Sequence, residues 1–222
     1  MDRSVVIASG VRTAIGTFGG ALRSVPPTAL AASVAREAIA RSTLSGGEIQ
    51  HAVFGNVIQT EPRDAYLARV AAIEAGVPET VPAMTLNRLC GSGLQAVVSA
   101  AQMILLGDAD AALAGGAESM SRVPYAVRDA RWGKRLGDTA LSDTLLETLH
   151  GPFGEGHMGV TAENVAGDCG IGREEQDRFA VESQRRAAAA IAEGRFREQI
   201  LPIEVPGKGG GSVFDTDEHV RA

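Results

Sequence analysis

The stretch from Asn87 to Leu94 places a cysteine, Cys90, between a short apolar run and a long hydrophobic segment. This pattern predicts a strand, a tight turn and a helix, with Cys90 at the helix N-terminus. Unpaired amides and the positive end of the helix dipole favour a thiolate there, and the thiolate is the nucleophilic form of cysteine. Gly91 and Gly93 let the backbone bend sharply and let a substrate reach the sulfur without meeting a β-carbon. Two interpretations stay open for Cys90 alone: a nucleophile that needs a base, or a buried structural cysteine.

The composition limits the classes of protein to which the chain can belong. Its 222 residues, 45% of them hydrophobic, indicate a soluble globular protein of one large or two small domains. Two cysteines, Cys90 and Cys169, are too few for a disulfide framework, and no secretory signal precedes the first predicted strand, so we expect a cytoplasmic protein. The net charge of −6 argues against a nucleic-acid surface. The longest apolar run, from Ala96 to Leu106, is too short to span a bilayer, and we expect no membrane role.

Strands and helices alternate along the first half of the chain. Runs of β-branched and apolar residues predict strands at 4–9, 52–58, 81–86 and 111–114. Apolar residues at helical spacing predict helices at 29–40, 66–74 and 94–106. We expect the first strand to be buried on both faces. This order favours an α/β fold with a mostly parallel sheet, helices on both faces, and ligands near the strand C-termini, where Cys90 stands.

The second half of the chain differs from the first in its composition and in the elements it predicts. Basic residues gather around Trp132 in a loop-rich stretch. Two helices follow, predicted at 161–166 and 174–192, and the longer one carries an apolar stripe that is expected to face inward. An edge strand is predicted at 200–205, because Pro202 breaks it. The remaining tail is expected to complete no recognisable unit.

Four motifs stand out in order along the chain: RTAIGTFGG at 12–20, NRLCGSGL at 87–94, GGAESMS at 115–121 and HMGVTAENVA at 157–166. Their residues and their order resemble the thiolase family, and the resemblance covers the chain from end to end. Four separate motifs in the right context are highly specific. The resemblance implies a thiolase-like α/β fold, in which two copies of a βαβαβαββ domain stack face to face and a loop domain is inserted in the first copy.

The resemblance also implies a domain organisation. Residues 1–119 would form the family's N-terminal α/β domain without its last strand, and residues 120–222 an incomplete inserted loop domain. The fifth strand and the second domain would lie beyond Ala222, and the second domain's glycine-histidine-proline motif and base cysteine have no match in this sequence. An open sheet edge and an exposed apolar helix at 94–106 are therefore expected, and with them self-association or poor solubility.

The same resemblance implies a chemistry. Cys90 would attack the thioester carbonyl of an acyl-CoA and form an acyl-cysteine, while its own amide donates to the oxyanion. A second acetyl-CoA would then give a 3-ketoacyl-CoA, most simply acetoacetyl-CoA. His157 and Met158 match positions that contact the pantetheine arm of CoA, and Leu149 and Arg221 align with further CoA contacts. No metal and no cofactor is implied, since CoA is substrate and product, and the family forms homodimers or homotetramers.

Two alternatives remain at this level. A truncated fragment would bind CoA or a partner subunit without turnover, because the family's activating histidine and base cysteine have no counterpart here. A related condensing enzyme would take acyl groups from a carrier protein, although the segment around His157 argues against it. Cys169 matches no catalytic motif and is expected to be a structural or incidental thiol.

Overall fold

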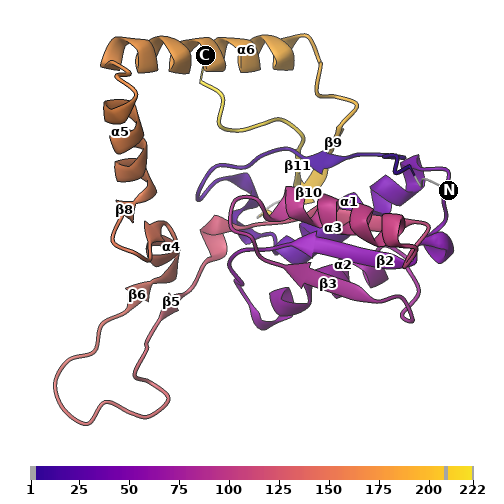
Figure 1. Cartoon of the computed structure of the whole chain (residues 1–222), viewed down its shortest axis with the longest axis horizontal. Coiled ribbons are helices and arrows are strands. Elements are labelled where there is room, and N and C mark those ends of the chain that lie inside the picture. Colours follow the sequence, from indigo (N-terminus) through magenta and orange to yellow (C-terminus); the bar gives the residue numbers. More distant parts are fainter. Residues whose placement is uncertain (1–3, 208–209, 222) are drawn as a thin grey trace. The chain divides into compact units, whose positions relative to one another are not determined.

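The computed structural model describes residues 4–207 and 210–221 (Figure 1). Contacts divide the chain into two compact units: the first is Met1–Arg122 with Phe196–His219, and the second is Val123–Arg195 with Val220–Ala222. The domain boundary predicted between residues 119 and 120 follows from the resemblance to the thiolase family, and it stays a prediction. The contact-based units differ from it in placing residues 196–219 with the N-terminal part of the chain.

The first unit is built on a parallel sheet with the strand order β3-β2-β4. The strands are β2 (His51–Gly55), β3 (Ala83–Leu86) and β4 (Ala112–Gly116). The strands predicted at these places are confirmed, with shifts of a few residues at their ends. Because the three strands run in parallel, their carboxyl ends meet at one edge of the sheet.

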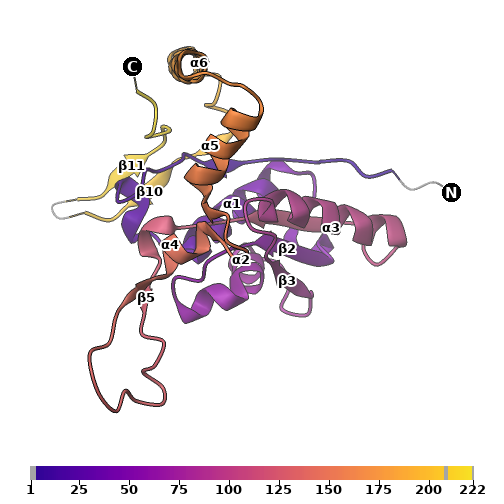
Figure 2. The ribbon, with the colours of Figure 1, turned by 60° about the vertical axis from the view of Figure 1, so that its left-hand side comes forward.

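Helices cover both faces of this sheet (Figure 2). They are α1 (Pro27–Arg41), α2 (Leu67–Glu74) and α3 (Ser92–Leu106). Ala52 and Phe54 of β2 are buried in a core shared with α1 and α2, whereas Val53 is buried against Ala96 and Ala100 of α3. This alternation along β2 is what a strand with two covered faces requires, and it confirms the predicted arrangement.

The strand predicted at 4–9 does not form. Residues 4–11 belong to no described strand, and the side chains of Val6 and Ile7 are 80% and 81% exposed. Pairing begins only at β1 (Arg12–Thr13), which lies parallel to β9 (Ile200–Leu201). The β-branched residues favour extended backbone, but a strand also needs a neighbouring strand with which its backbone pairs, and no described strand pairs with residues 4–9.

A cavity of about 510 Å³ borders this unpaired segment. Residues 9–18 line it together with residues 113–121, which comprise most of β4 and the segment after it. Further apolar side chains in its wall are Leu22, Leu30, Val34, Ala35, Ala38 and Phe54. Within the described residues β4 pairs with β2 alone, so its other edge is open. The open sheet edge expected from the sequence is thus confirmed.

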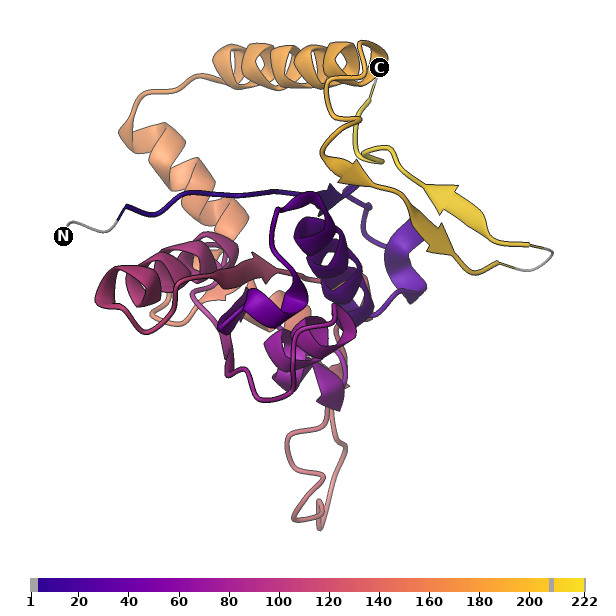
Figure 3. The ribbon, with the colours of Figure 1, turned by 90° about the vertical axis from the view of Figure 1, so that its right-hand side faces the viewer.

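Short helices and a hairpin complete the first unit. The 3-10 helices are η1 (Ala21–Ser24), η2 (Gly46–Glu48), η3 (Pro62–Tyr66) and η4 (Met120–Arg122). β10 (Ile203–Val205) pairs antiparallel with β11 (Ser212–Phe214) in the hairpin that Figure 3 shows in yellow. The predicted edge strand is confirmed as β9 and β10, which are separated at Pro202. The expectation that the tail completes no unit is wrong, because β11 pairs with β10.

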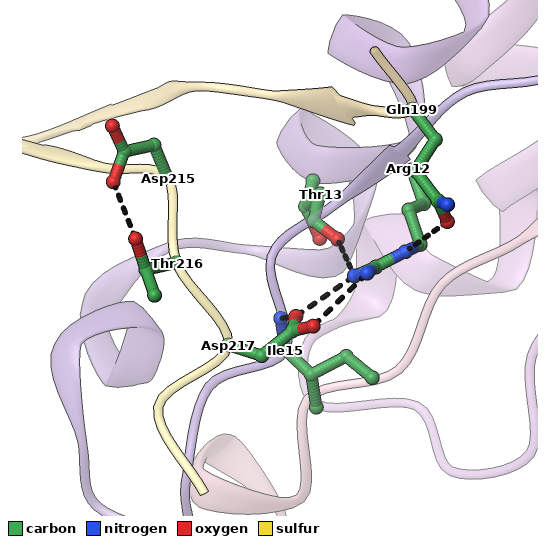
Figure 4. A network of polar contacts seen from close by, with 7 residues as sticks. All are labelled: Arg12, Thr13, Ile15, Gln199, Asp215, Thr216 and Asp217. Carbon is green, nitrogen blue, oxygen red and sulfur yellow. Dashed lines mark hydrogen bonds and ion pairs between the residues drawn. The ribbon is translucent and has the colours of Figure 1, made fainter. Parts of the chain in front are cut away.

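The end of the first unit is tied to its beginning by charged contacts (Figure 4). The Asp217 carboxylate accepts two hydrogen bonds from the Arg12 guanidinium, at 2.8 and 2.9 Å, and one from the Ile15 amide at 2.8 Å. These bonds with Arg12 lower the pKa of the Asp217 carboxyl. Next to it, Glu218 accepts the amide of Thr17 at 2.8 Å. The loop at 12–20 is therefore held by a segment some 200 positions away in sequence.

The apolar helix α3 covers the sheet with one face only. Ser92, Ala96 and Ala100 are buried, while Leu94 and Leu106 are 72% and 79% exposed. The exposed apolar helix expected from the sequence is confirmed. By length and composition alone, the stretch 89–106, which contains α3 and the turn before it, is the one candidate membrane span among the described residues, and 17% of that stretch is buried.

The second unit consists of helices and short strand pairs. Its helices are α4 (Thr144–Thr148), α5 (Met158–Asp168) and α6 (Arg173–Ala192). Its strands pair antiparallel, β5 (Tyr125–Ala126) with β6 (Ser142–Asp143) and β7 (His150–Gly151) with β8 (Gly156–His157). The inward-facing stripe predicted for α6 is wrong for this chain: α6 has no buried residue, and Phe179 is 78% exposed. An apolar stripe is buried only where another element packs against it.

Candidate functional site

Cys90 lies in the turn that connects β3 to α3, and its side chain is exposed. Gly91 is the N-cap of α3 and Ser92 is its first residue, so Cys90 immediately precedes the helix, as predicted. The exposure rules out the interpretation of Cys90 as a buried structural cysteine in this chain. Its role as a nucleophile stays a prediction.

The backbone before Cys90 has an unusual conformation that two side chains hold. Leu89 has φ +48°, the one non-glycine residue with positive φ among the described residues. The Asn87 side chain accepts the Leu89 amide at 2.8 Å and donates to the Val57 carbonyl at 3.0 Å. The Ser92 hydroxyl donates to the Leu89 carbonyl at 2.7 Å. Both polar groups of Leu89 are thus fixed by neighbouring side chains.

Glycines let the first turn of α3 lie directly on the sheet. A β-carbon added to Gly55, the last residue of β2, would lie 2.6 Å from the carbonyl carbon of Ser92. One added to Gly116, the last residue of β4, would lie 3.0 Å from the Gly55 carbonyl oxygen and 3.4 Å from the α-carbon of Gly93. The separation at Gly55 leaves no room for a side chain, and at Gly116 the neighbouring backbone would have to move by a few tenths of an ångström. The position of the turn that carries Cys90 therefore depends on these strand-end glycines.

Polar groups gather where the strands end, next to the cysteine turn. The Glu118 carboxylate, after β4, accepts the amides of Val57 and Ile58 at 2.8 and 3.2 Å and the Asn56 side chain at 3.3 Å. Burial of this carboxyl group raises the pKa of Glu118, although these backbone amides oppose the shift. Nothing in the local sequence marks Asn56 as part of a site. The only signal for Glu118 was its place in the motif at 115–121.

Three of the predicted CoA-binding residues lie together in the second unit. Leu149 is the C-cap of α4, and its carbonyl accepts the Met158 amide at 3.0 Å. His157 is the N-cap of α5, where its Nδ1 accepts the Gly159 amide at 3.0 Å. The His157 ring also meets the His150 ring edge to face, with 5.2 Å between centroids. Leu149 and Met158 are therefore joined by a backbone hydrogen bond, and His157, the neighbour of Met158, pairs with His150, the neighbour of Leu149.

The other predicted residues lie elsewhere. Arg221 docks on α6, where its amide donates to the Gln184 side chain at 2.7 Å. Cys90 belongs to the first unit, while Leu149, His157, Met158 and Arg221 belong to the second. Cys169 is the exposed C-cap of α5. Within residues 4–207 and 210–221, no three histidine, cysteine or acidic side chains are grouped so that they could hold a metal ion.

The fold and the site together define an α/β protein with a cysteine presented at a strand-to-helix turn. The family model described as thiolase, N-terminal domain, matches residues 5–222. The chain belongs to the thiolase family, which confirms the resemblance drawn from the four motifs.

Similar proteins are named as a beta-ketothiolase and as acetyl-CoA acetyltransferases. Beta-ketothiolase BktB of Cupriavidus necator is 62% identical over 221 residues, and an acetyl-CoA acetyltransferase of Pseudomonas aeruginosa is 47% identical over 222 residues. The alignments cover 100% and 99% of this chain but 56% of each relative. The chain thus spans about half the length of the curated relatives that it matches.

Solved structures agree on the fold. The acetyl-CoA acetyltransferase of Bacillus anthracis has a TM-score of 0.93 and 44% identity, covering 98% of this chain and 55% of that one. Human mitochondrial 3-ketoacyl-CoA thiolase in complex with CoA has a TM-score of 0.92 and 39% identity, covering 96% of this chain and 53% of that one. The predicted thiolase-like fold, limited to its first half, is confirmed.

Proposed function

We propose that this chain carries the acyl-accepting half of a thiolase-type acyltransferase, with Cys90 as the nucleophile. The observation that supports it best is the exposed thiol directly before a helix start, in a chain of the thiolase family. The Cys90 thiolate would attack the thioester carbonyl of an acyl-CoA, so that a bond forms between Sγ and the acyl carbon. The bond from that carbon to the CoA sulfur then breaks, and CoA leaves as a thiolate that takes up a proton.

The complete reaction that we propose joins two acyl-CoA molecules. A general base, which the family carries in its second domain, would take an α-proton from acetyl-CoA. The resulting carbanion would form a bond to the acyl carbon and expel the Cys90 thiolate, which gives a 3-ketoacyl-CoA, in the simplest case acetoacetyl-CoA. The reverse direction is thiolysis. We propose that the pantetheine arm of CoA contacts Leu149, His157, Met158 and Arg221. CoA serves as substrate and product, and the proposal includes no further cofactor. We also propose a cytoplasmic homo-oligomer, without a nucleic-acid or membrane partner.

A second candidate follows from the coverage of the relatives. Because the chain spans 56% of their length, it would on its own bind CoA or a partner subunit without completing the reaction. The two candidates differ in whether Cys90 exchanges acyl groups. The carrier-protein alternative differs in the donor, because it requires an acyl group carried by a protein.

The exchange of labelled CoA into acetyl-CoA separates these candidates, because it needs only the first half-reaction. We expect the purified chain to catalyse this exchange, and Cys90→Ala to abolish it while Cys169→Ala preserves it. Exchange that is absent in the unmodified chain would overturn the proposed nucleophile and favour binding alone. Acylation by an acetylated carrier protein, without exchange from acetyl-CoA, would favour the carrier-dependent enzyme. Acetoacetyl-CoA thiolysis at the rate of an intact thiolase would exclude the binding-only candidate.

A further inference from the structure

We infer that Asn87 and Ser92 are positioning residues, which hold the peptide between Leu89 and Cys90 so that the Cys90 amide can donate to the acyl oxygen. The inference rests on the proposed function, because it names the groups that prepare the site for attack by Cys90.

Leu89 requires an external restraint. Its φ of +48° lies in the left-handed region, which a leucine avoids because its β-carbon crowds the backbone there. The Asn87 Oδ1 atom accepts the Leu89 amide at 2.8 Å, and this bond exists only while the backbone turns at that point. The Asn87 Nδ2 atom is in turn anchored to the Val57 carbonyl at 3.0 Å, just after β2. Asn87 therefore ties the turn to the neighbouring strand end.

That strand end is itself fixed. The amide of Val57 donates to the Glu118 carboxylate at 2.8 Å, so contacts run from the end of β4 through Val57 and Asn87 to Leu89. The three strand ends of the sheet thus share one set of hydrogen bonds beside the cysteine. The exposed turn is held by the sheet as well as by its own residues.

Ser92 fixes the other side of Leu89. Its hydroxyl donates to the Leu89 carbonyl at 2.7 Å and accepts the Arg88 amide at 2.8 Å, and its own amide donates to the same carbonyl at 2.9 Å. Ser92 is 4% exposed, so its hydroxyl has little access to water. A carbonyl held by two donors from the first turn of α3 cannot rotate freely.

The orientation of the Cys90 amide follows from the planar peptide. In a trans peptide the N–H points opposite to the preceding C=O, and no cis peptide occurs in the described chain. Because the Leu89 carbonyl points toward Ser92, the Cys90 N–H points away from the first turn of α3. An N–H in this direction is a donor for the negative oxygen that forms when the thiolate attacks a carbonyl. If Leu89 relaxed to negative φ, this peptide would rotate and the donor would be misdirected.

Two reagents distinguish the effect of the Cys90 amide donor from the effect of the thiolate. p-Nitrophenyl acetate acylates Cys90 through a tetrahedral oxyanion, whereas iodoacetamide alkylates it by direct displacement, without an oxyanion. Both reactions need the thiolate, so the ratio of their rate constants does not depend on the fraction of Cys90 that is present as thiolate. The measurement uses the full chain with Cys169→Ala in every variant, and Cys90→Ala gives the background.

We expect Asn87→Ala to lower this ratio about tenfold, because an unrestrained leucine leaves the left-handed region. Ser92→Ala should lower it in the same direction. Adding Leu89→Gly to Asn87→Ala should restore the ratio to within about threefold of the parent, because glycine adopts positive φ without penalty. Ser99→Ala is the matched control: this residue lies two turns further along α3 and bonds to Gln95, so the ratio should stay unchanged.

A ratio within twofold of the parent in both Asn87→Ala and Ser92→Ala would overturn the inference. So would a loss in Asn87→Ala that Leu89→Gly leaves uncorrected, because the turn would then matter for a reason other than the conformation of Leu89. Acylation by p-nitrophenyl acetate with the expected ratios, but no acylation by acetyl-CoA, would support the positioning role and overturn the proposed function instead.

Discussion

Substitution of Gly55 by alanine tests how α3 is seated on the sheet. The added β-carbon would lie 2.6 Å from the carbonyl carbon of Ser92 and 2.7 Å from its β-carbon. Favourable contact between carbon atoms begins at about 3.5 Å, so the first turn of α3 has to move by roughly 1 Å. The obstructing atoms belong to backbone and to a buried residue, and no side-chain rotation can relieve the contact. We expect Gly55→Ala to lower the free energy of unfolding by about 3 kcal/mol, near the upper end for overpacked interiors.

Urea unfolding followed by circular dichroism measures this effect. Gly93→Ala is the matched control, because a β-carbon at Gly93 meets no atom within 4 Å and the residue lies inside the same helix. Alanine is the better helix former, so this control should be as stable as the parent or up to about 1 kcal/mol more stable. A free energy of unfolding for Gly55→Ala within about 0.5 kcal/mol of the parent would refute the reasoning, since surface substitutions have effects of that size.

Two further predictions concern the ends of the chain and its apolar surface. Hydrogen bonds from the Arg12 guanidinium lower the pKa of Asp217 in the folded chain, so the ionised Asp217 stabilises the fold. This stabilisation is complete above the pKa of about 4 that aspartate has in the unfolded chain, and it is lost as the pH falls through the lower pKa of the folded chain. Asp217→Asn should therefore flatten the decline of stability below pH 4 in acid titrations of the unfolding midpoint, and an unchanged slope would contradict this. The open edge of β4 and the exposed Leu94 and Leu106 should make the chain associate, as measured by sedimentation velocity. The double variant Leu94→Glu, Leu106→Glu should associate less than the parent chain. A parent chain that is a monodisperse monomer would contradict the prediction of association.

The sequence predicts helices and strands well where the spacing of apolar residues agrees with the glycine and proline residues that end each element. The helices α1, α2 and α3 and the strands β2, β3 and β4 form where the apolar patterns place them. The pattern fails where an element depends on a distant partner. Residues 4–9 have the composition of a strand but no paired strand among the described residues, and the apolar stripe of α6 contains no buried residue. Both errors concern packing, which a single segment of sequence does not encode.

Many of the other features that the sequence does not predict are polar contacts between residues far apart in the chain. The pairing of Arg12 with Asp217 joins residues 205 positions apart, and nothing in the local sequence selects this aspartate from the others. In the turn that carries Cys90, too, some features follow from the local sequence and others depend on distant residues. The position of Cys90 before a helix follows from its neighbours, whereas the bond from Asn87 to Val57 arises only because β2 and β3 pair in register. The contact between Leu149 and Met158 likewise depends on the pairing of β7 with β8.

The central claim is that Cys90 accepts an acyl group from acyl-CoA. The most direct measurement is mass spectrometry of the chain after incubation with acetyl-CoA and acid quenching, followed by peptide mapping. We predict one acetyl group on the peptide that contains Cys90, removed by added CoA and absent in Cys90→Ala. A chain that remains unmodified at Cys90, or that carries the acetyl group on Cys169 instead, would contradict the account.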